Sequence, residues 1–238
     1  MISLQKLGLR FAEISITNPA DFQFLLDKYR ALSRGIDFFF LCHGPREGDP
    51  NDIDTLESVY LPKLLQVLSV MPRLDMRLLT FHLWLDPRFV LEETIVYKIG
   101  FLKRLTERAG DSGITVCIEN LSENADHLKE VFAAVPTLNL TLDLGHAELL
   151  SKENTSFGFL EKCPDRIKHI HLHDNRGGYS PDDDLHFPVG EGKIDFYKIF
   201  QRLHAVHYRG TVTLELRPDQ IRSCLGYVEH LVDPDSRG

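Results

Sequence analysis

The chain has 238 residues, of which 43% are hydrophobic and 26% are charged, as in an ordinary globular domain. Its formal charge of −8 argues against a dedicated nucleic-acid binder, because such proteins carry a basic surface. Acids that bind a metal would weaken that argument. Residues 1–6 lack the apolar stretch of a signal peptide, and no apolar run approaches the length of a membrane span. Cys42, Cys117, Cys163 and Cys224 show no paired spacing, so we expect a reduced, cytoplasmic protein.

Strand-like and helix-like segments alternate along the chain. The predicted strands cover residues 10–16, 38–42, 78–81, 114–119, 140–143, 167–171 and 211–215. The first predicted helix starts near residue 18, and another segment is helical up to about residue 160. The other predicted helices cover residues 54–70 (interrupted by Pro62), 91–109, 124–135, 195–204 and 220–232. This alternation, without a break in composition, predicts a parallel sheet covered by helices. We therefore expect one domain over residues 1–238.

Four of the predicted strands end in a carboxylate or a histidine, namely Glu119, Asp143, His171 and Glu215. Because a strand alternates faces, each of these side chains lies on one face while its aliphatic neighbours lie on the other. A strand-end acid can merely cap the next helix, but four such strands together indicate one shared site. Polar chemistry at the carboxyl ends of the strands favours a TIM-type (β/α) barrel over an open sheet.

The barrel is expected to lack its first strand, because only seven strands are recognisable. Residues 3–7 look like a helix that would follow such a strand, and a complete barrel typically needs about 250 residues. An open seam would expose strand edges, which proteins normally cover. We therefore expect a second copy of the chain, in a homo-oligomer, or the N-terminal helix to shield the seam.

Further histidines lie near the same predicted rim. His43 and His82 each follow a strand, and His169, His171 and His173 share one strand face. Asp184 and His186 lie in a polar loop, residues 174–193, beside Gly190-Glu191-Gly192. A lone histidine at a strand end is more often structural than a ligand. Buried together, however, so many polar groups require a cation or a substrate to satisfy them.

These motifs resemble the xylose-isomerase-like TIM barrel superfamily of sugar and sugar-phosphate isomerases, epimerases and endonuclease IV-type enzymes. The resemblance covers residues 10–231 and is carried by Ile118-Glu119-Asn120, Leu142-Asp143-Leu144-Gly145-His146, His171-Leu172-His173-Asp174, Gly190-Glu191-Gly192 and Leu214-Glu215-Leu216.

The resemblance implies that Glu119, Asp143, His171 and Glu215 hold a central divalent metal. The endonuclease IV-type members imply two further ions, one held by His43, His82 and Glu119, the other by His146, Asp184 and His186. Mixed imidazole and carboxylate ligands favour zinc, manganese or cobalt over magnesium or calcium.

Three functions fit this set. The favoured one is a metal-dependent sugar or sugar-phosphate isomerase or epimerase, in which Glu119 and Glu215 exchange protons through a metal-bound enediolate. His146, His173 and His186 would then bind the substrate. Arg217 would bind a phosphate or hydroxyl, or form a surface ion pair.

The second function is an endonuclease IV-type phosphodiester hydrolase with two or three metals. The full ligand set favours it, whereas the short loops and the missing basic run argue against it. The third is a non-catalytic metal- or ligand-binding barrel, suggested by the missing strand. The expected partner is a small carbohydrate or sugar phosphate, and neither nucleic acid nor a membrane is expected.

Overall fold

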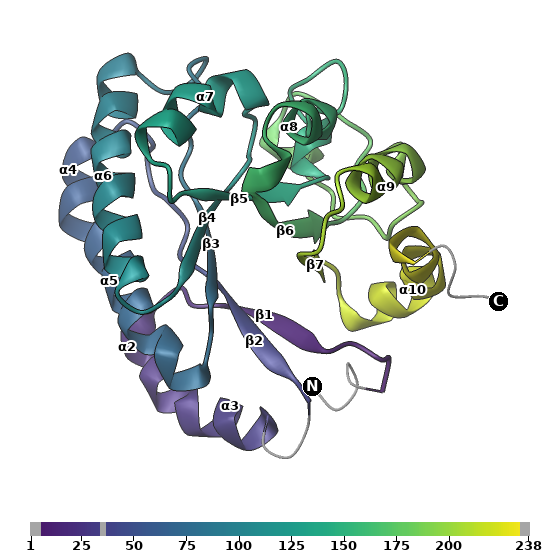
Figure 1. The fold of residues 1–238 in the computed structure, drawn as a ribbon, viewed down its shortest axis with the longest axis horizontal. Coiled ribbons are helices and arrows are strands. Elements are labelled where there is room, and N and C mark those ends of the chain that lie inside the picture. The colour runs from purple at the N-terminus through teal and green to yellow at the C-terminus, as the bar shows by residue number, and fades with distance from the viewer. Residues whose placement is uncertain (1–5, 34–36, 234–238) are drawn as a thin grey trace. The chain divides into compact units, whose positions relative to one another are not determined.

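The computed structural model describes residues 6–33 and 37–233 (Figure 1). The helix predicted over residues 3–7 lies mostly outside the described residues, and residues 6–8 form a turn. The chain divides into two compact units. The first comprises Met1–Glu119 and His127–Asn139, and the second comprises Asn120–Asp126 and Leu140–Gly238. That the chain acts as a single domain stays a prediction.

The first unit contains a parallel sheet whose strands follow one another in chain order. Its strands are β1 (Phe11–Ser15), β2 (Phe39–His43), β3 (Leu78–His82) and β4 (Thr115–Glu119). The register pairs Ser15 with His43, and His82 with Glu119. His43 pairs with Thr80, so His82 and Glu119 lie two residues farther along their strands than His43, at the same edge of the sheet.

One face of this sheet carries the candidate ligands and the other packs against helices. Leu41, Leu78 and Cys117 form a buried cluster two or four residues before His43, His82 and Glu119, and Phe11 packs against it. On the opposite face, Phe40 makes an edge-on ring contact with Tyr29, at 5.6 Å between centroids. The predicted alternation of faces is confirmed for β4, where Cys117 lies on the same face as Glu119.

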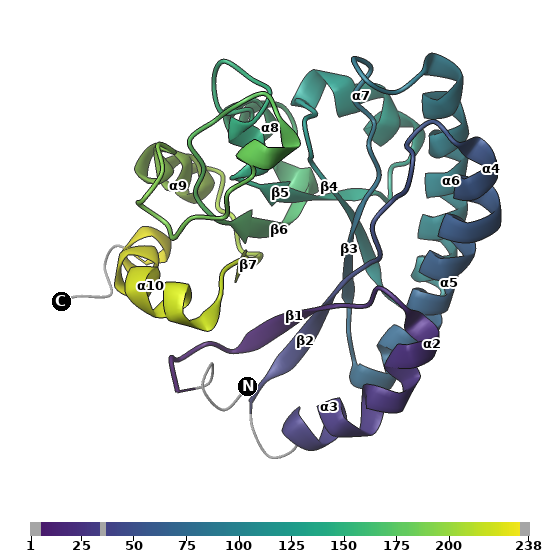
Figure 2. The same ribbon diagram turned by 180° about the vertical axis from the view of Figure 1, so that it is seen from behind.

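The helices of the first unit are amphipathic, and α5 and α6 run side by side (Figures 1 and 2). They are α2 (Pro19–Phe22), α3 (Leu26–Ser33), α4 (Ile53–Thr55), α5 (Leu61–Val70), α6 (Glu92–Gly110) and α7 (Ala125–Ala134), with short 3₁₀ turns at η1 (Gln23–Leu25) and η3 (Met71–Leu74). The helix α7 begins in the segment assigned to the second unit. Asn18 caps α2 by accepting a hydrogen bond from the Ala20 amide at 3.1 Å, as its sequence predicts.

The interruption expected at Pro62 is a π-helical turn, η2 (Leu56–Tyr60), which links α4 to α5. Proline has no amide hydrogen, and its ring clashes with the carbonyl four residues earlier. A wider turn accommodates that clash without ending the helix. Pro62 then lies in the first turn of α5.

The second unit contains three further parallel strands, β5 (Asn139–Asp143), β6 (Ile167–Leu172) and β7 (Thr211–Leu214). Asp143 pairs with His171, and His171 pairs with Thr213. The helices are α8 (Ser156–Lys162), α9 (Phe196–Ala205) and α10 (Pro218–Val232), with short 3₁₀ turns at η4 (His146–Glu148), η5 (Pro164–Arg166) and η6 (Pro181–Asp183). Seven strands thus lie in the described ranges, each within one residue of its predicted bounds at either end. Glu215 follows β7 directly instead of ending it.

None of the helices in the described ranges has both the length and the apolar character that crossing a membrane would require.

Candidate metal centre

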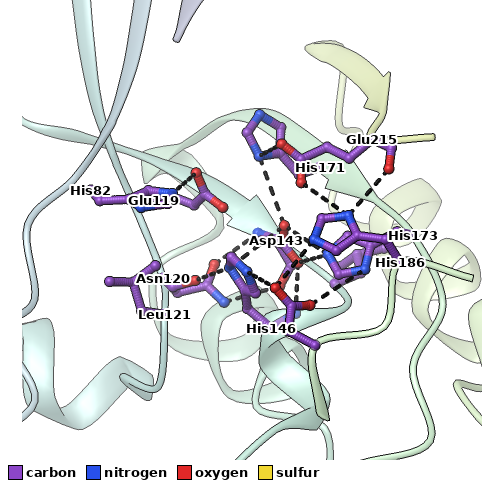
Figure 3. Close-up of polar contacts among 12 residues, drawn as sticks. His82, Glu119, Asn120, Leu121, Asp143, His146, His171, His173, His186 and Glu215 are labelled. Atoms are coloured by element: carbon purple, nitrogen blue, oxygen red, sulfur yellow. Dashed lines mark hydrogen bonds and ion pairs between the residues drawn. The ribbon is translucent and has the colours of Figure 1, made fainter. Parts of the chain in front are cut away.

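In the first unit, two imidazoles converge on the carboxylate that ends β4. His43 Nε2 and His82 Nε2 each lie 3.1 Å from Glu119 Oε2. Glu119 is only 2% exposed. Figure 3 shows the imidazole of His82 turned toward this carboxylate. The structure therefore brings together the three residues predicted for one flanking ion.

The hydrogen bonds of His43 direct its Nε2 at the Glu119 carboxylate. Its Nδ1 lies 2.9 Å from the Gly44 carbonyl oxygen, which can only accept a hydrogen bond, so Nδ1 carries a hydrogen. In a neutral ring, Nε2 would then direct its lone pair at the Glu119 carboxylate. A proton on Nε2, or a cation beside both atoms, removes that repulsion.

In the second unit, Asp143 is a fully buried carboxylate at the end of β5. Its amide nitrogen donates to Asn120 Oδ1 at 2.8 Å, and its carbonyl accepts from Asn120 Nδ2 at 2.9 Å. Its side chain accepts from the His146 amide at 2.6 Å, so the carboxylate does cap the next turn. The same carboxylate also lies 3.1 Å from His173 Nε2. Capping and ligation are therefore compatible at this residue.

His171 and Glu215 extend this group of ligand atoms (Figure 3). His171 Nδ1 lies 3.2 Å from Glu215 Oε1 and 3.8 Å from Asp143 Oδ2. Asp143, His173 and Glu215 offer ligand atoms that all lie within 4.8 Å of one another. The Glu215 side chain is 23% exposed, whereas His171 is fully buried. Glu215 is thus the most solvent-exposed member of this group.

A second cluster in this unit joins His146, His173, Asp184 and His186. His146 Nε2 and His186 Nε2 lie 3.3 and 3.1 Å from Asp184 Oδ2. The rings of His173 and His186 are stacked at 3.8 Å between centroids. The buried Nδ1 of His173 has no hydrogen-bond partner among the described residues. An orphaned buried nitrogen beside a carboxylate is a feature that a bound cation would satisfy.

The electrostatics of this cluster also favour a cation. Burial alone would raise the pKa of Asp184, but hydrogen bonds from His146 and His186 outweigh it and hold this pKa well below its usual range. Burial alone would lower the pKa of His186, but the hydrogen bond and charge of Asp184, together with Glu215, raise it to about 9. The carboxylates therefore draw positive charge to these nitrogens.

Two predicted or suspected site residues lie outside these groups. The Arg217 side chain is 74% exposed and lies 3.7 Å from Asp219, so its role toward a substrate stays a prediction. His169 is buried, and its Nδ1 and Nε2 lie 2.6 and 2.9 Å from the hydroxyls of Thr211 and Thr213. Both ring nitrogens of His169 are thus engaged by β7.

Two asparagines of the site have supporting roles that the sequence alone did not reveal. Asn120 pairs with the backbone of Asp143, as described above. Asn175 Nδ2 donates to Asp184 Oδ1 at 3.2 Å, and its Oδ1 accepts from the Leu185 amide at 2.7 Å. The signal available in the sequence was the position of each asparagine, directly after a strand-end motif.

The donor set suits a transition metal. Imidazole nitrogens and carboxylate oxygens in roughly equal numbers match zinc or manganese better than calcium, which prefers oxygen ligands alone. The described residues therefore contain groups that could hold a divalent metal.

Comparisons with known proteins agree with this architecture. A family model described as "Xylose isomerase-like TIM barrel" matches residues 3–231. Two uncharacterized proteins of Methanocaldococcus jannaschii are similar: MJ1311 is 28% identical over 52% of this chain and 44% of its own length, and MJ1188 is 27% identical over 88% and 80%. The 3-dehydro-D-guloside 4-epimerase of Escherichia coli is 28% identical over 49% of this chain and 44% of its own length. The chain thus spans less than half the length of two of these relatives.

Solved structures share the fold at low identity. A xylose isomerase domain protein from Planctomyces limnophilus has a TM-score of 0.78 at 17% identity, covering 100% of this chain and 92% of that one. D-psicose 3-epimerase with D-tagatose, from Clostridium cellulolyticum H10, has a TM-score of 0.76 at 15% identity, covering 97% and 92%. The TTHB071 protein from Thermus thermophilus, from a crystal soaked with ZnCl₂, has a TM-score of 0.76 at 24% identity, covering 100% and 94%.

The family model covers nearly the whole chain, and the structural likenesses confirm the predicted TIM-barrel fold class. The chain belongs to the xylose isomerase-like TIM barrel family.

Proposed function

We propose that this protein is a divalent-metal-dependent epimerase or isomerase of a sugar or sugar phosphate. The observation that carries the proposal is the group formed by Asp143, His171, His173 and Glu215 at the carboxyl ends of β5, β6 and β7. It combines buried ligands with one partly exposed carboxylate. The relatives named as sugar epimerases support the substrate class.

The residues of this group divide the chemistry between them. A bound metal would polarise the carbonyl of a ketose and acidify the neighbouring carbon–hydrogen bond. Asp143, His171 and Glu215 are the ligands that we assign from the second unit. Glu119 completes the set on the strength of its sequence motif at the end of β4. His173 and Asp143 would keep each other oriented through their 3.1 Å contact.

Glu215 is our candidate for moving a proton. Its Oε1 lies 3.2 Å from His171 Nδ1, and its side chain is 23% exposed. A carboxylate in this position can remove a proton from the carbon next to the substrate's carbonyl. Glu119 is proposed as the second proton-transfer group, because an epimerase must remove a proton from one face of the carbon and return one to the other. His146 and His186 would then orient hydroxyl groups of the sugar.

A metal-dependent phosphodiester hydrolase is the second candidate. It is favoured by the cluster of His146, His173, Asp184 and His186, because this cluster and the group of Asp143, His171 and Glu215 together offer more ligands than a single ion requires. Additional metals would activate water and bind a phosphate.

Hydrogen exchange with solvent tests the first proposal. Protein loaded in turn with zinc, manganese or cobalt is incubated in D₂O with a panel of ketoses and ketose phosphates. We expect deuterium at the carbon next to the carbonyl together with the epimer, both detected by NMR. The Glu215→Gln variant should lose about 10²–10⁴-fold in rate while retaining its fold. Glu229→Gln, an exposed acid on α10, is the matched control and should keep its rate.

The alternative outcomes are distinct. No exchange with any sugar would contradict the epimerase. Chelator-sensitive hydrolysis of bis-p-nitrophenyl phosphate, with two or three metal equivalents per chain, would favour the hydrolase.

A further inference from the structure

A buried ion pair in the first unit lies outside the ligand set. Lys98 Nζ lies 2.5 Å from Glu47 Oε1, and the two side chains are 0% and 5% exposed. Lys98 lies on α6, in the buried stripe that also contains Thr94, Phe101, Leu102 and Leu105. Glu47 lies in the loop that follows His43. The pair thus joins the β2 loop to a helix through the apolar core.

The same pair holds the peptide groups of Trp84 from both sides. The Trp84 amide donates to Glu47 Oε2 at 2.7 Å, and the Trp84 carbonyl accepts from Lys98 Nζ at 2.7 Å. Trp84 is two residues beyond His82, at the start of the loop that follows β3. Two charged side chains from other elements thus bond to the backbone of this loop residue.

Tyr60 extends the same arrangement to His82 itself. Its buried hydroxyl lies within hydrogen-bonding distance of the carbonyl oxygens of His82 and Pro45, the latter at 3.0 Å. Both residues that flank Leu83 are therefore tied to side chains from other elements. These contacts connect the loop that follows His43 to the segment that begins at His82.

Stability alone does not explain a buried ion pair. Removing two charges from water costs about as much as their attraction returns, and apolar residues of similar volume often do equally well. Burial raises the pKa of Glu47, and Lys98 and the Trp84 amide only oppose that effect. What an apolar pair cannot supply is directional hydrogen bonding to both sides of Trp84.

We propose that Glu47 and Lys98 are positioning residues, which fix the His82–Trp84 segment so that the His82 imidazole is directed at Glu119. This inference rests on the metal dependence of the proposed function and on the predicted flanking site, in which His43, His82 and Glu119 are metal ligands. Partners behind a ligand typically change metal affinity about 10–100-fold when they are removed.

Trp84 provides a built-in reporter, because it is the only tryptophan of the chain. The main variant is the double substitution Glu47→Gln and Lys98→Met. It removes both charges at similar side-chain volume, so neither charge is left buried without its partner. The matched control is Arg108→Met with Asp111→Asn, an exposed pair at the end of α6 at 3.2 Å. For each protein we measure the thermal unfolding temperature, acrylamide quenching of Trp84 without metal, and zinc affinity by competition with a chromophoric chelator.

We expect the double variant to unfold within a few degrees of the parent, with more strongly quenched Trp84 emission and a zinc dissociation constant raised about 10–100-fold. The control should match the parent in all three. Unchanged quenching, or unchanged zinc affinity in a folded variant, would overturn the inference. If the double variant does not fold, Tyr60→Phe decides, because it removes only the hydroxyl at His82 and should also weaken zinc binding. If the parent binds no zinc, manganese or cobalt, the proposed function fails. Trp84 quenching alone then tests whether Glu47 and Lys98 fix the His82–Trp84 segment.

Discussion

At the scale of single residues, Gly145 is the position where the candidate metal centre leaves least room. A Cβ atom built there would lie 2.1 Å from Cε1 of the His173 ring. The backbone of Gly145 is in the ordinary right-handed helical region, with φ −73° and ψ −49°, so any residue could adopt it. The glycine is therefore required by the imidazole and not by the backbone.

We predict that Gly145→Ala displaces His173. Overpacking of this kind costs about 1–3 kcal/mol of stability. Because His173 contacts both Asp143 and His186, the displacement should also weaken metal binding about 10–100-fold. Thermal unfolding and a zinc titration measure the two effects.

Gly158→Ala is the matched control for this substitution. Its added Cβ would lie 4.0 Å from the Ala125 side chain, an ordinary contact, and the residue is inside α8. It should stabilise the helix slightly and leave zinc affinity unchanged. Equal zinc affinity in both glycine variants would contradict the steric argument.

At the scale of elements, an ion pair links the π turn η2 to the helix α6. Arg104 makes a bidentate contact with Glu57 at 2.6 and 2.8 Å, and the Tyr97 hydroxyl donates to the same carboxylate. The hydrogen bond from Arg104, followed by that from Tyr97, lowers the pKa of Glu57 to about 2. Both members of the ion pair are about half exposed, so salt should weaken it.

The pH dependence follows from the direction of this shift. A carboxyl whose pKa is lowered on folding stabilises the protein above its ordinary pKa of 4.5, and this contribution disappears as the pH falls toward 2. We therefore predict that Glu57→Gln unfolds at a lower temperature than the parent at pH 7, and that the difference shrinks between pH 4.5 and 2. The double variant Glu57→Gln with Arg104→Met should lose less stability than the two single variants lose together. A difference that stays constant across the acid range would contradict the assignment.

Local patterns were sufficient to predict the elements, because each pattern depends on neighbouring residues alone. The strand at residues 114–119 alternates apolar and polar side chains, and the helix at 91–109 repeats its apolar residues with helical spacing. The π turn before Pro62 could not be predicted in form, because proline permits either a break or a wider turn. The same limit applies to Lys98, since a lysine within an apolar stripe can equally extend its charge to solvent.

At the scale of the whole molecule, the proximity of the candidate ligands was predictable because parallel strands end at one edge of their sheet, whereas their role as metal ligands stays a prediction. His43, His82 and Glu119 meet in the first unit for that reason, and Asp143, His171 and Glu215 meet in the second. The supporting contacts were not predictable, because they join side chains to distant backbone groups. Lys98 with Trp84 and Asn120 with Asp143 are examples, and neither pair has a periodic signature.

Metal binding should stabilise the chain as a whole. A ligand that binds only the folded state stabilises it by about 2.7 kcal/mol at a concentration one hundred times its dissociation constant. For a protein of this size, that corresponds to a rise of roughly 5–10 °C in unfolding temperature.

We therefore predict that zinc raises the unfolding temperature of chelator-treated protein in a concentration-dependent way. Asp143→Asn, which removes a central carboxylate, should lower the unfolding temperature of the chelator-treated protein. It should also largely abolish the rise that zinc produces. Magnesium should have a smaller effect than zinc, because imidazole ligands suit it poorly. Equal unfolding temperatures with zinc and with chelator would show that these clustered side chains do not form a metal site.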